Sequence, residues 1–520
     1  MSRVLVLLAA LATACSAEAR VKCIGHGWDL LHVTLEEVLA NADRFDRTAL
    51  DGVTLMIDMD VKDGRHITHA HAMTDGRWPR GELAARIPVL KSIAAHPSLR
   101  ESFLSSWWEP TKRLSWKDDK SWADFAANMG TLAYLAKEGG LPGILVDNED
   151  YPKAHQYEWN PAADGDYETT AKMARIRGRE VFGAIFREYP SITFLSFWLY
   201  AETTGSRKYY DAREPRTMAR RQGDLWQAFL DGMLDVMPPE ARLIDGDEGA
   251  YFYSATRNDF YRSAARQRKM SPRLAAPENA AKCRAQLLAG FGLYLDSYLK
   301  PEGDRYSLGP LDGSRLAHFG ANLEQAGAAA DGYVWLYGER HAWIDWAGIK
   351  DTRWTKCGSW DGALPGFTET ARDAKEPRRR WERLVACGTN LIEPGFSVYN
   401  ANEKASGAFA KTKLMATGPL SGCFLVDVKS VRPGEKYVFA ATGEGPHSSA
   451  LVCWTKKGAW NWDAVTTTVE FLPDGAGAYR GLVEVTVPDG VDGMRTQLGV
   501  ALAGGETCRY RDVRCVKVGK

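Results

Sequence analysis

The strongest constraint on the fold is a pattern that occurs eight times between residues 21 and 390. Each occurrence is a short, nearly continuous apolar run that ends in polar or aromatic residues, and an amphipathic helical segment follows it. Apolar runs without alternation are typical of parallel strands buried on both faces. Eight strand–helix units predict an α/β fold, a closed (β/α)8 TIM barrel. The runs are VKCIGHGWD, VTLMIDMD, SFLSSWWE, GILVDNED, ITFLSFWLY, RLIDGDEGAYFY, GLYLDSYL and GYVWLYGERHAW.

Local signals between the runs support helices. Thr34 followed by Glu37 predicts a capping box, and Ser121 with Asp124 predicts a second one. Pro190 predicts the end of a third helix. The rival architecture is an open doubly wound sheet, but no G-x-G-x-x-G follows the first run, so the barrel is favoured.

The pattern changes near residue 388, where helical periodicity gives way to short alternating strands separated by Gly and Pro turns. We therefore expect a signal peptide over 1–19, a barrel over 20–388 and an all-β sandwich over 389–520. The last part resembles the galactose-binding-like jelly rolls of carbohydrate-binding modules. The segments that carry this resemblance are NLIEPGF, RPGEKYVFAA, VTVPDG and YRDVRCVKV.

The first twenty residues have the features of an export signal. Arg3 precedes a short apolar run, and an A-x-A motif ends at Ala19. Cys15, in LATAC, offers lipid attachment as an alternative. We expect a secreted or periplasmic protein, or a lipoprotein tethered at the cell surface. No other segment approaches the ~20 apolar residues of a membrane span.

Charge and motifs exclude several function classes. Lys+Arg and Asp+Glu both total 66, so no basic surplus indicates a nucleic-acid partner. No dinucleotide or Walker-type loop is present, and no cofactor is expected. Eight cysteines follow Cys15 without a C-x-x-C pair, so a zinc site is not predicted and their pairing stays open. The oligomeric state also stays open.

In a TIM barrel the active site lies where the strands end, at their carboxyl ends. There the runs present carboxylates interleaved with aromatic side chains. The candidate catalytic residues are Asp147, Glu149, Glu248 and Glu339. The candidate substrate-binding residues are His26, Trp28, Asp58, Trp108, Asn148, Trp198, Tyr251, Asp296, Tyr337 and Trp343.

This set of residue types indicates glycoside hydrolysis. One carboxyl group protonates the leaving oxygen, and a second attacks the anomeric carbon or activates water. Aromatic faces suit the apolar C–H surface of a sugar ring. Metal binding is the rival chemistry, but no H-x-H, H-E-x-x-H or D-x-D-x-D-G spacing appears. The alternatives for single residues are core packing for the tryptophans, a satisfied buried ring for His26 and an Arg340 ion pair for Glu339.

The fourth run resembles two groups of barrel glycosidases. Asn148-Glu149 is similar to the Asn-Glu pair of the large retaining clan of cellulases and β-galactosidases. That resemblance implies that Glu149 is the acid/base and that Asn148 contacts the 2-position of the sugar. The clan's nucleophile is a Glu on strand seven, where this chain has Asp296.

The same run also resembles the chitinase D-x-D-x-E strand. Asp147 and Glu149 match its last two acids, and Leu145 stands in place of the earlier Asp. The last run, GYVWLYGERHAWIDW, resembles the retaining clan's eighth strand, which carries a Trp that faces the sugar.

The leading hypothesis is an exported glycoside hydrolase that acts on a poly- or oligosaccharide. Glu149 is the expected general acid, with its pKa raised by burial or by Asp147 and Asp150. Glu248 or Glu339 is the expected second carboxylate. Two alternatives are a non-catalytic glycan-binding barrel of a polysaccharide uptake system and a metal-dependent lyase or hydrolase.

Overall fold

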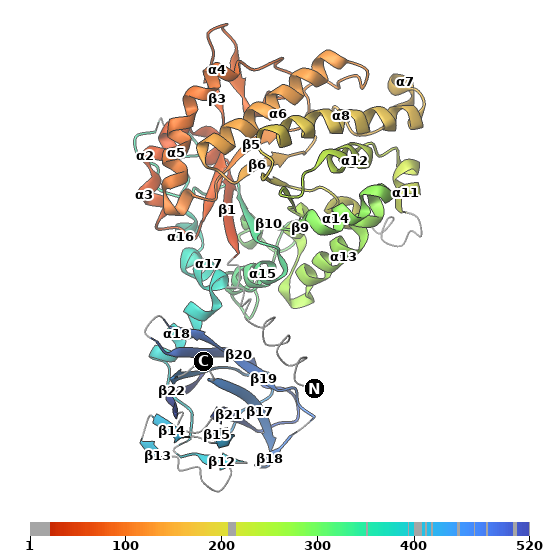
Figure 1. Ribbon diagram of the computed structural model, residues 1–520. Coiled ribbons are helices and arrows are strands. Elements are labelled where there is room, and N and C mark those ends of the chain that lie inside the picture. The colour runs from red at the N-terminus through yellow and green to blue at the C-terminus, as the bar shows by residue number, and fades with distance from the viewer. Residues whose placement is uncertain are drawn as a thin grey trace. The chain divides into compact units, whose positions relative to one another are not determined.

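The computed structural model describes residues 21–518 except 206–214, 350–351, 394, 400–407, 411–412, 418–419, 445–447, 462, 475–476 and 503–506. The predicted signal peptide and Cys15 lie outside the described residues. The chain forms two compact units, Met1–Lys375 and Glu376–Lys520 (Figure 1). Within the described part, no helix has both the length and the hydropathy needed to cross a bilayer.

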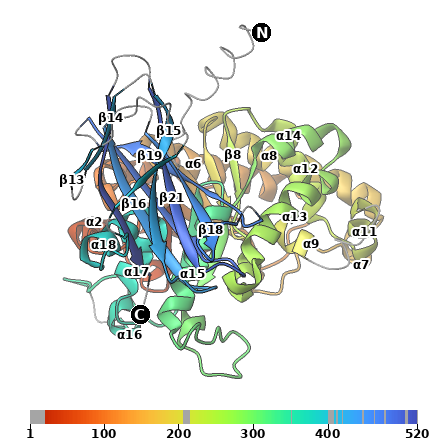
Figure 2. The same ribbon diagram turned by 90° about the horizontal axis from the view of Figure 1, so that it is seen from below.

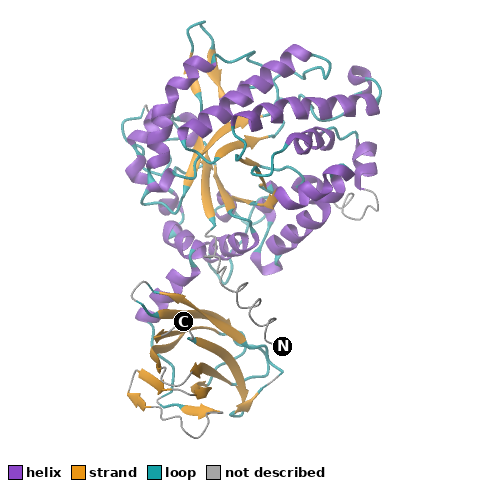
Figure 3. Cartoon of the chain, viewed as in Figure 1, coloured by secondary structure: helices purple, strands orange, loops and turns teal. Residues whose placement is uncertain are grey.

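The first unit is a parallel β-barrel surrounded by helices, as the eight runs predicted (Figure 3). The strand order is β10-β11-β1-β2-β5-β6-β7-β8-β9, and every neighbouring pair is parallel. The strands are β1 (Lys22–Gly27), β2 (Gly52–Leu55), β5 (Phe103–Trp107), β6 (Gly143–Asp147), β7 (Thr193–Ser196), β8 (Arg242–Asp245), β9 (Leu287–Ala289), β10 (Phe291–Tyr294) and β11 (Tyr333–Gly338). A separate hairpin joins β3 (Asp58–Asp60) to β4 (His66–Thr68).

The two ends of this strand order are halves of one chain segment, and they complete the ring. Only Gly290 separates β9, which pairs with β8, from β10, which pairs with β11. The Gly290 amide donates a hydrogen bond to the carbonyl of Asp245 at 2.8 Å. A Cβ at Gly290 would lie 2.7 Å from Ile244 Cγ2, so a side chain has no room there. The seventh strand is therefore continuous in sequence and changes partner at its glycine.

The helices of this unit follow the strands as a βα repeat requires. They are α2 (Leu35–Ala40), α3 (Ala42–Phe45), α4 (Arg80–Leu83), α5 (Ile87–Ala95), α6 (Asp119–Gly139), α7 (Pro161–Asp164), α8 (Tyr167–Glu188), α9 (Ala201–Gly205), α11 (Pro215–Gln222), α12 (Trp226–Val236), α13 (Asp259–Leu274), α14 (Ala280–Gln286), α15 (Arg315–Ala329), α16 (Trp360–Ala363) and α17 (Phe367–Lys375).

Two of the three predicted helix ends are confirmed. The Thr34–Glu37 capping box is present at the start of α2. Helix α8 ends at Glu188, just before Pro190. The predicted box at Ser121 is wrong, because α6 begins earlier: Asp118 is the N-cap and accepts a hydrogen bond from the Ser121 amide at 3.1 Å.

The barrel has two apolar layers. Inside it, strand residues such as Ile24, Leu145 and Trp335 pack together and are at most 1% exposed. Between strands and helices, other residues of the same strands pack against α6, α8 and α12. Because side chains alternate along a strand, each run supplies both layers, which explains its continuous apolar character.

The second unit is an antiparallel β-sandwich preceded by α18 (Pro377–Cys387). Its strands form one continuous 11-stranded sheet with the order β12-β15-β21-β17-β19-β20-β16-β22-β14-β13, with β18 paired to β17. Strand β19 joins the two halves of this order, because it pairs with β17 and with β20. Figure 2 shows these strands running beside one another. They are β12 (Ser397–Tyr399), β13 (Ala408–Ala410), β14 (Lys413–Thr417), β15 (Leu420–Lys429), β16 (Lys436–Glu444), β17 (Ser449–Lys456), β18 (Ala459–Trp460), β19 (Thr467–Pro473), β20 (Tyr479–Thr486), β21 (Gly493–Leu502) and β22 (Thr507–Lys517).

Candidate active site

A cavity of about 420 Å³ lies where β6, β8, β10 and β11 end. These ends meet because parallel neighbours in a barrel carry their carboxyl termini to one rim. The lining is mostly acidic and aromatic: Glu149, Tyr151, Glu202, Glu248, Gly249, Tyr251, Phe252, Tyr294, Lys300, Tyr306, Tyr337 and Glu339. Five of these side chains, those of Glu149, Glu248, Glu339, Tyr251 and Tyr337, were candidates from the sequence.

The central feature of the cavity is a pair of carboxyl groups. Glu149 follows β6 by two residues, and Glu248 opens the short 3-10 helix Glu248–Phe252 after β8. Their side chains are hydrogen-bonded to each other. Two carboxyl groups can share a hydrogen bond only if one of them holds a proton, because a carboxylate only accepts.

The surroundings favour that proton on Glu248. Burial raises the pKa of Glu248 to about 9, and the nearby carboxylates of Glu149, Asp147 and Glu202 add to this effect. Burial also raises the pKa of Glu149, but hydrogen bonds from Tyr151 and from Glu248 stabilise its charged form. The pair therefore shares a proton, and burial together with the neighbouring carboxylates favours that proton on Glu248.

A strained turn presents Glu248. Asp247 has φ 38°, a left-handed conformation that is uncommon for residues other than Gly. Its carboxylate is 3% exposed and accepts hydrogen bonds from Gln267 Nε2 at 3.1 Å and Tyr253 Oη at 3.2 Å. Helix α13, which carries Gln267, thus fixes the conformation of the residue just before the acid.

Asp147 contacts the backbone of Glu149. It ends β6, is 5% exposed, and accepts a hydrogen bond from the Glu149 amide at 2.9 Å. Burial, followed by the charge of Glu149, raises the pKa of Asp147 well above its usual range. Asp147 does not line the cavity, so its contact with the pair runs through the backbone.

Glu339 is the third carboxylate of the cavity, and two tyrosines hold it. Tyr294 Oη donates to Oε2 at 2.7 Å, and Tyr337 Oη donates to Oε1 at 3.3 Å. The backbone amide of Glu339 donates to Asp296 Oδ2 at 2.8 Å, and burial raises the pKa of Asp296. No ion pair joins Glu339 to Arg340 within the described residues.

The side chain of Asn148 forms its hydrogen bonds with other groups of the protein. Its Nδ2 donates to the Trp198 carbonyl at 3.0 Å, and Ser196 Oγ donates to its Oδ1 at 3.3 Å. The side chain braces the end of β7 and does not line the cavity. The amide that the retaining-clan resemblance assigns to a sugar contact is therefore buried, with Asn148 5% exposed.

His26 and Trp28 lie at the mouth of the barrel beside Tyr337. The His26 ring is 5.5 Å from that of Tyr337, and its Nδ1 is 3.0 Å from Thr54 Oγ1. Burial lowers the pKa of His26 to about 3, so this ring is neutral. Trp28 stacks on Trp354 with ring centroids 5.3 Å apart.

Three candidates lie elsewhere. The Trp108 side chain is fully buried against Phe182 and other rings between strand and helices. Trp343 is buried, and its Nε1 donates to the His26 carbonyl at 3.3 Å. Asp58 belongs to the β3–β4 hairpin, where its carboxylate lies 2.9 Å from His66 Nε2.

Sequence reasoning missed six side chains of the lining, namely Tyr151, Glu202, Phe252, Tyr294, Lys300 and Tyr306. Tyr151, Phe252 and Tyr294 stood within or beside the quoted runs, and only their neighbours were considered. Glu202 comes from α9, and Lys300 and Tyr306 come from the loop after β10, where no periodicity indicates which side chain turns inward.

Among the described residues, one group of side chains could hold a metal ion, as the metal-dependent alternative requires. Asp43, Asp46 and His96 place ligand atoms within 4.8 Å of one another. None of the three lines the cavity, and both carboxylates are exposed.

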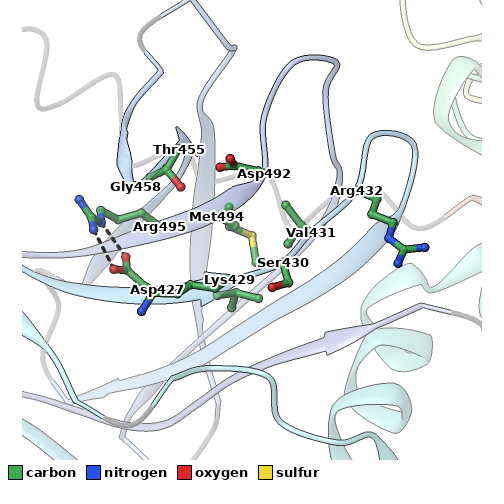
Figure 4. A pocket seen from close by; sticks show the side chains of 12 residues that line it. Asp427, Lys429, Ser430, Val431, Arg432, Thr455, Gly458, Asp492, Met494 and Arg495 are labelled. Atoms are coloured by element: carbon green, nitrogen blue, oxygen red, sulfur yellow. Dashed lines mark hydrogen bonds and ion pairs between the residues drawn. The ribbon is translucent and has the colours of Figure 1, made fainter.

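A second cavity, of about 440 Å³, lies in the β-sandwich (Figure 4). Its main charged groups are already paired: Arg495 binds Asp427 through two hydrogen bonds of 2.6 and 2.8 Å. Asp492 accepts from the Lys457 amide at 2.9 Å. Its two carboxylates are thus each bound by another group, whereas the barrel cavity holds two carboxyl groups that interact with each other, so the barrel cavity is the candidate active site.

Comparison with known proteins gives weak likenesses. No family model matches the chain, and no curated protein matches it. A solved structure described as a glycoside hydrolase is 12% identical over 93% of this chain and 96% of its own, with a TM-score of 0.31. A carbohydrate-binding module, TmCBM61 in complex with β-1,4-galactotriose, is 12% identical over 25% of this chain and 99% of its own, with a TM-score of 0.19.

The enzymatically active domain of bacteriophage CBA120 tailspike protein 4 is 14% identical over 25% of this chain, with a TM-score of 0.19. The match spans 18% of that chain. At this level of similarity, only the residues of this protein indicate what it does.

Proposed function

We propose that this protein is a glycoside hydrolase whose active site is the barrel cavity. The observation that carries the proposal is the hydrogen-bonded Glu149–Glu248 pair, which keeps one buried carboxyl group protonated at neutral pH. Glycoside hydrolysis needs one carboxyl that stays protonated beside one that stays ionised. The tyrosine-rich walls offer apolar faces for sugar rings.

The electrostatics support a different proposal for the two roles from the sequence hypothesis. Glu248 is the proposed general acid, because its pKa is raised to about 9 and it carries the shared proton. Glu149 is the proposed carboxylate that faces the anomeric carbon. Retaining enzymes keep their carboxyl groups ~5–5.5 Å apart, and inverting enzymes keep theirs ~6.5–9.5 Å apart to hold a water molecule. A pair close enough to share a hydrogen bond is nearer to the retaining spacing. Retention of configuration is therefore the expected outcome.

Glu339 has a separate role in this proposal. Its two oxygens already accept hydrogen bonds from Tyr294 and Tyr337, which fix its position and weaken it as a nucleophile. A carboxylate held in this way suits binding of sugar hydroxyl groups.

Three amide variants test the assignment. Glu248→Gln and Glu149→Gln are each expected to lower turnover of a glycan substrate by at least ~10³-fold, since either removes a group that acts in the transition state. Asp58→Asn, in the hairpin outside the cavity, is the matched control and is expected to behave as wild type. Near-wild-type turnover in Glu149→Gln and Glu248→Gln would overturn the proposal.

The same assay separates the alternatives. Saccharide binding by calorimetry without any increase in reducing ends would indicate a glycan-binding barrel that is not an enzyme. Loss of activity on chelation would indicate the metal-dependent reaction. Proton NMR of the first product decides between retention and inversion.

Export is part of the proposal and is supported by the leader-like residues 1–19. N-terminal sequencing and mass spectrometry of the protein recovered from its compartment distinguish cleavage after Ala19 from lipid attachment at Cys15.

A further inference from the structure

One wall of the barrel cavity is basic. The loop after β10 carries Lys300 and Arg305, and both lie over aromatic rings that line the cavity. Lys300 Nζ lies 5.2 Å from the ring centroid of Tyr294 and 5.1 Å from that of Tyr306. Arg305 Cζ lies 5.1 Å from the Tyr306 centroid. We call Lys300, Arg305 and the rings of Tyr294, Tyr306 and Phe252 the basic wall.

Carboxylates neutralise little of the positive charge of the two cations in the basic wall. Lys300 Nζ has one ion-pair partner among the described residues, Asp304 at 3.9 Å. In the same part of the chain, Arg305 forms neither an ion pair nor a hydrogen bond through its guanidinium group. Elsewhere in the barrel, Arg175 binds Asp235 through two hydrogen bonds of 2.7 and 2.6 Å. Aromatic faces, rather than carboxylates, hold the two cations in place.

The basic wall lies next to the proposed reaction centre. Tyr294 joins the two, because its hydroxyl donates to Glu339 at 2.7 Å while its ring lies under Lys300. Phe252 extends the wall outward: it is 41% exposed, and its ring centroid lies 5.2 Å from that of Tyr306. A sugar ring placed on this wall would therefore have both cations within reach of its substituents.

The charges of the cavity indicate what such a sugar carries. The other charged residues of the lining are the carboxyls Glu149, Glu202, Glu248 and Glu339, and none is within ion-pair distance of Lys300. A neutral sugar needs no cation, and an acidic sugar would be repelled by this lining unless cations offset the repulsion. Lys and Arg bind carboxylate and sulfate groups through charge-assisted hydrogen bonds.

We propose that the basic wall is a subsite for a sugar with an anionic substituent, a uronate carboxylate or a sulfate ester, so that the substrate is an acidic glycan. This inference rests on the proposed hydrolase function of the same cavity. It assigns Lys300 and Arg305 as substrate-binding residues outside the Glu149–Glu248 pair.

The test uses the full-length protein and three kinds of glycan. Unsulfated chondroitin carries carboxylates only, κ-carrageenan carries sulfates only, and unsubstituted linear β-1,4-xylan and mixed-linkage β-glucan carry neither. Hydrolysis is measured by reducing ends, and binding is measured by calorimetry with the Glu248→Gln protein. We expect cleavage or binding of a carboxylate or a sulfate glycan, at least tenfold stronger than of the neutral glycans and weakened by salt.

Charge-removing variants connect that preference to the wall. Lys300→Met and Arg305→Gln are each expected to lower the acidic-to-neutral ratio of kcat/KM, or of the association constant, by at least fivefold, mainly through KM. Lys117→Met, an exposed cation of the loop after β5, is the matched control and keeps the ratio. Thermal melting checks that each variant is folded.

The outcomes separate this inference from the proposed function. Charge-dependent binding without hydrolysis would overturn the hydrolase and keep the subsite. Hydrolysis of neutral glycans in preference to acidic ones, an unchanged ratio in both variants, or no binding of any acidic glycan would overturn the subsite.

Discussion

The substitution Glu248→Gln gives the sharpest physical test of the proposed acid, because it links stability to pH. In the folded protein the pKa of Glu248 is raised from 4.5 to about 9, mainly by burial. Between these values the folded chain holds one proton at this position that the unfolded chain has lost. The free energy of unfolding therefore falls as pH rises, by about 1.4 kcal/mol per pH unit from this group alone.

The variant should not show this loss. A glutamine side chain is neutral at every pH, and its amide can still donate a hydrogen bond to Glu149. Between pH 4.5 and 7 the wild type loses about 3 kcal/mol from Glu248, and Glu248→Gln loses none. We expect the two proteins to be similarly stable near pH 4.5 and the inactive variant to be about 3 kcal/mol more stable at pH 7.

The assay is urea unfolding of both proteins from pH 4.5 to 8 in one mixed buffer, followed by tryptophan fluorescence. Titrating groups that do not interact with Glu248 are shared by the two proteins and cancel in the difference. Glu240→Gln, an exposed residue just before β8, is the control and should give a flat difference. A difference between wild type and Glu248→Gln that changes by less than about 1 kcal/mol over this range would refute the assignment of a protonated buried Glu248.

Three further substitutions test other parts of the structure. Tyr294→Phe removes the hydrogen bond of 2.7 Å to Glu339 and should lower kcat/KM about 10- to 100-fold, since a bond to a charged group contributes about 1.5–3 kcal/mol; steady-state kinetics that match wild type would contradict a role for Glu339. Gly178→Ala would place a Cβ 2.1 Å from the Phe229 carbonyl where α8 packs on α12, and should destabilise the barrel by about 1–3 kcal/mol or more in urea. Trp108→Ala empties a fully buried site and should cost about 3–5 kcal/mol of stability while leaving the KM of the folded protein unchanged; a selective rise in KM would place Trp108 at the substrate instead.

The sequence by itself determined the architecture. Eight apolar runs became the strands of the barrel, and alternating runs after residue 388 became strands of the sandwich, because burial on two faces or on one imposes these periods. It also indicated the rim on which the site lies, since the carboxyl ends of parallel strands meet at one edge. Glu149, Glu248 and Glu339 stand there as a consequence.

Only the tertiary structure decided which side chains face the cavity. Neighbouring residues at a strand end point in opposite directions, so Trp108 packs in the core and Asn148 braces β7, although both stood in promising runs. No periodicity in the sequence predicts the change of strand partner at Gly290, the strained backbone of Asp247 or the loop that carries Lys300. The proposal of Glu248 as the general acid also depended on the tertiary structure. The pKa of a carboxyl group reflects burial and neighbouring charge, which a chain acquires only when it folds.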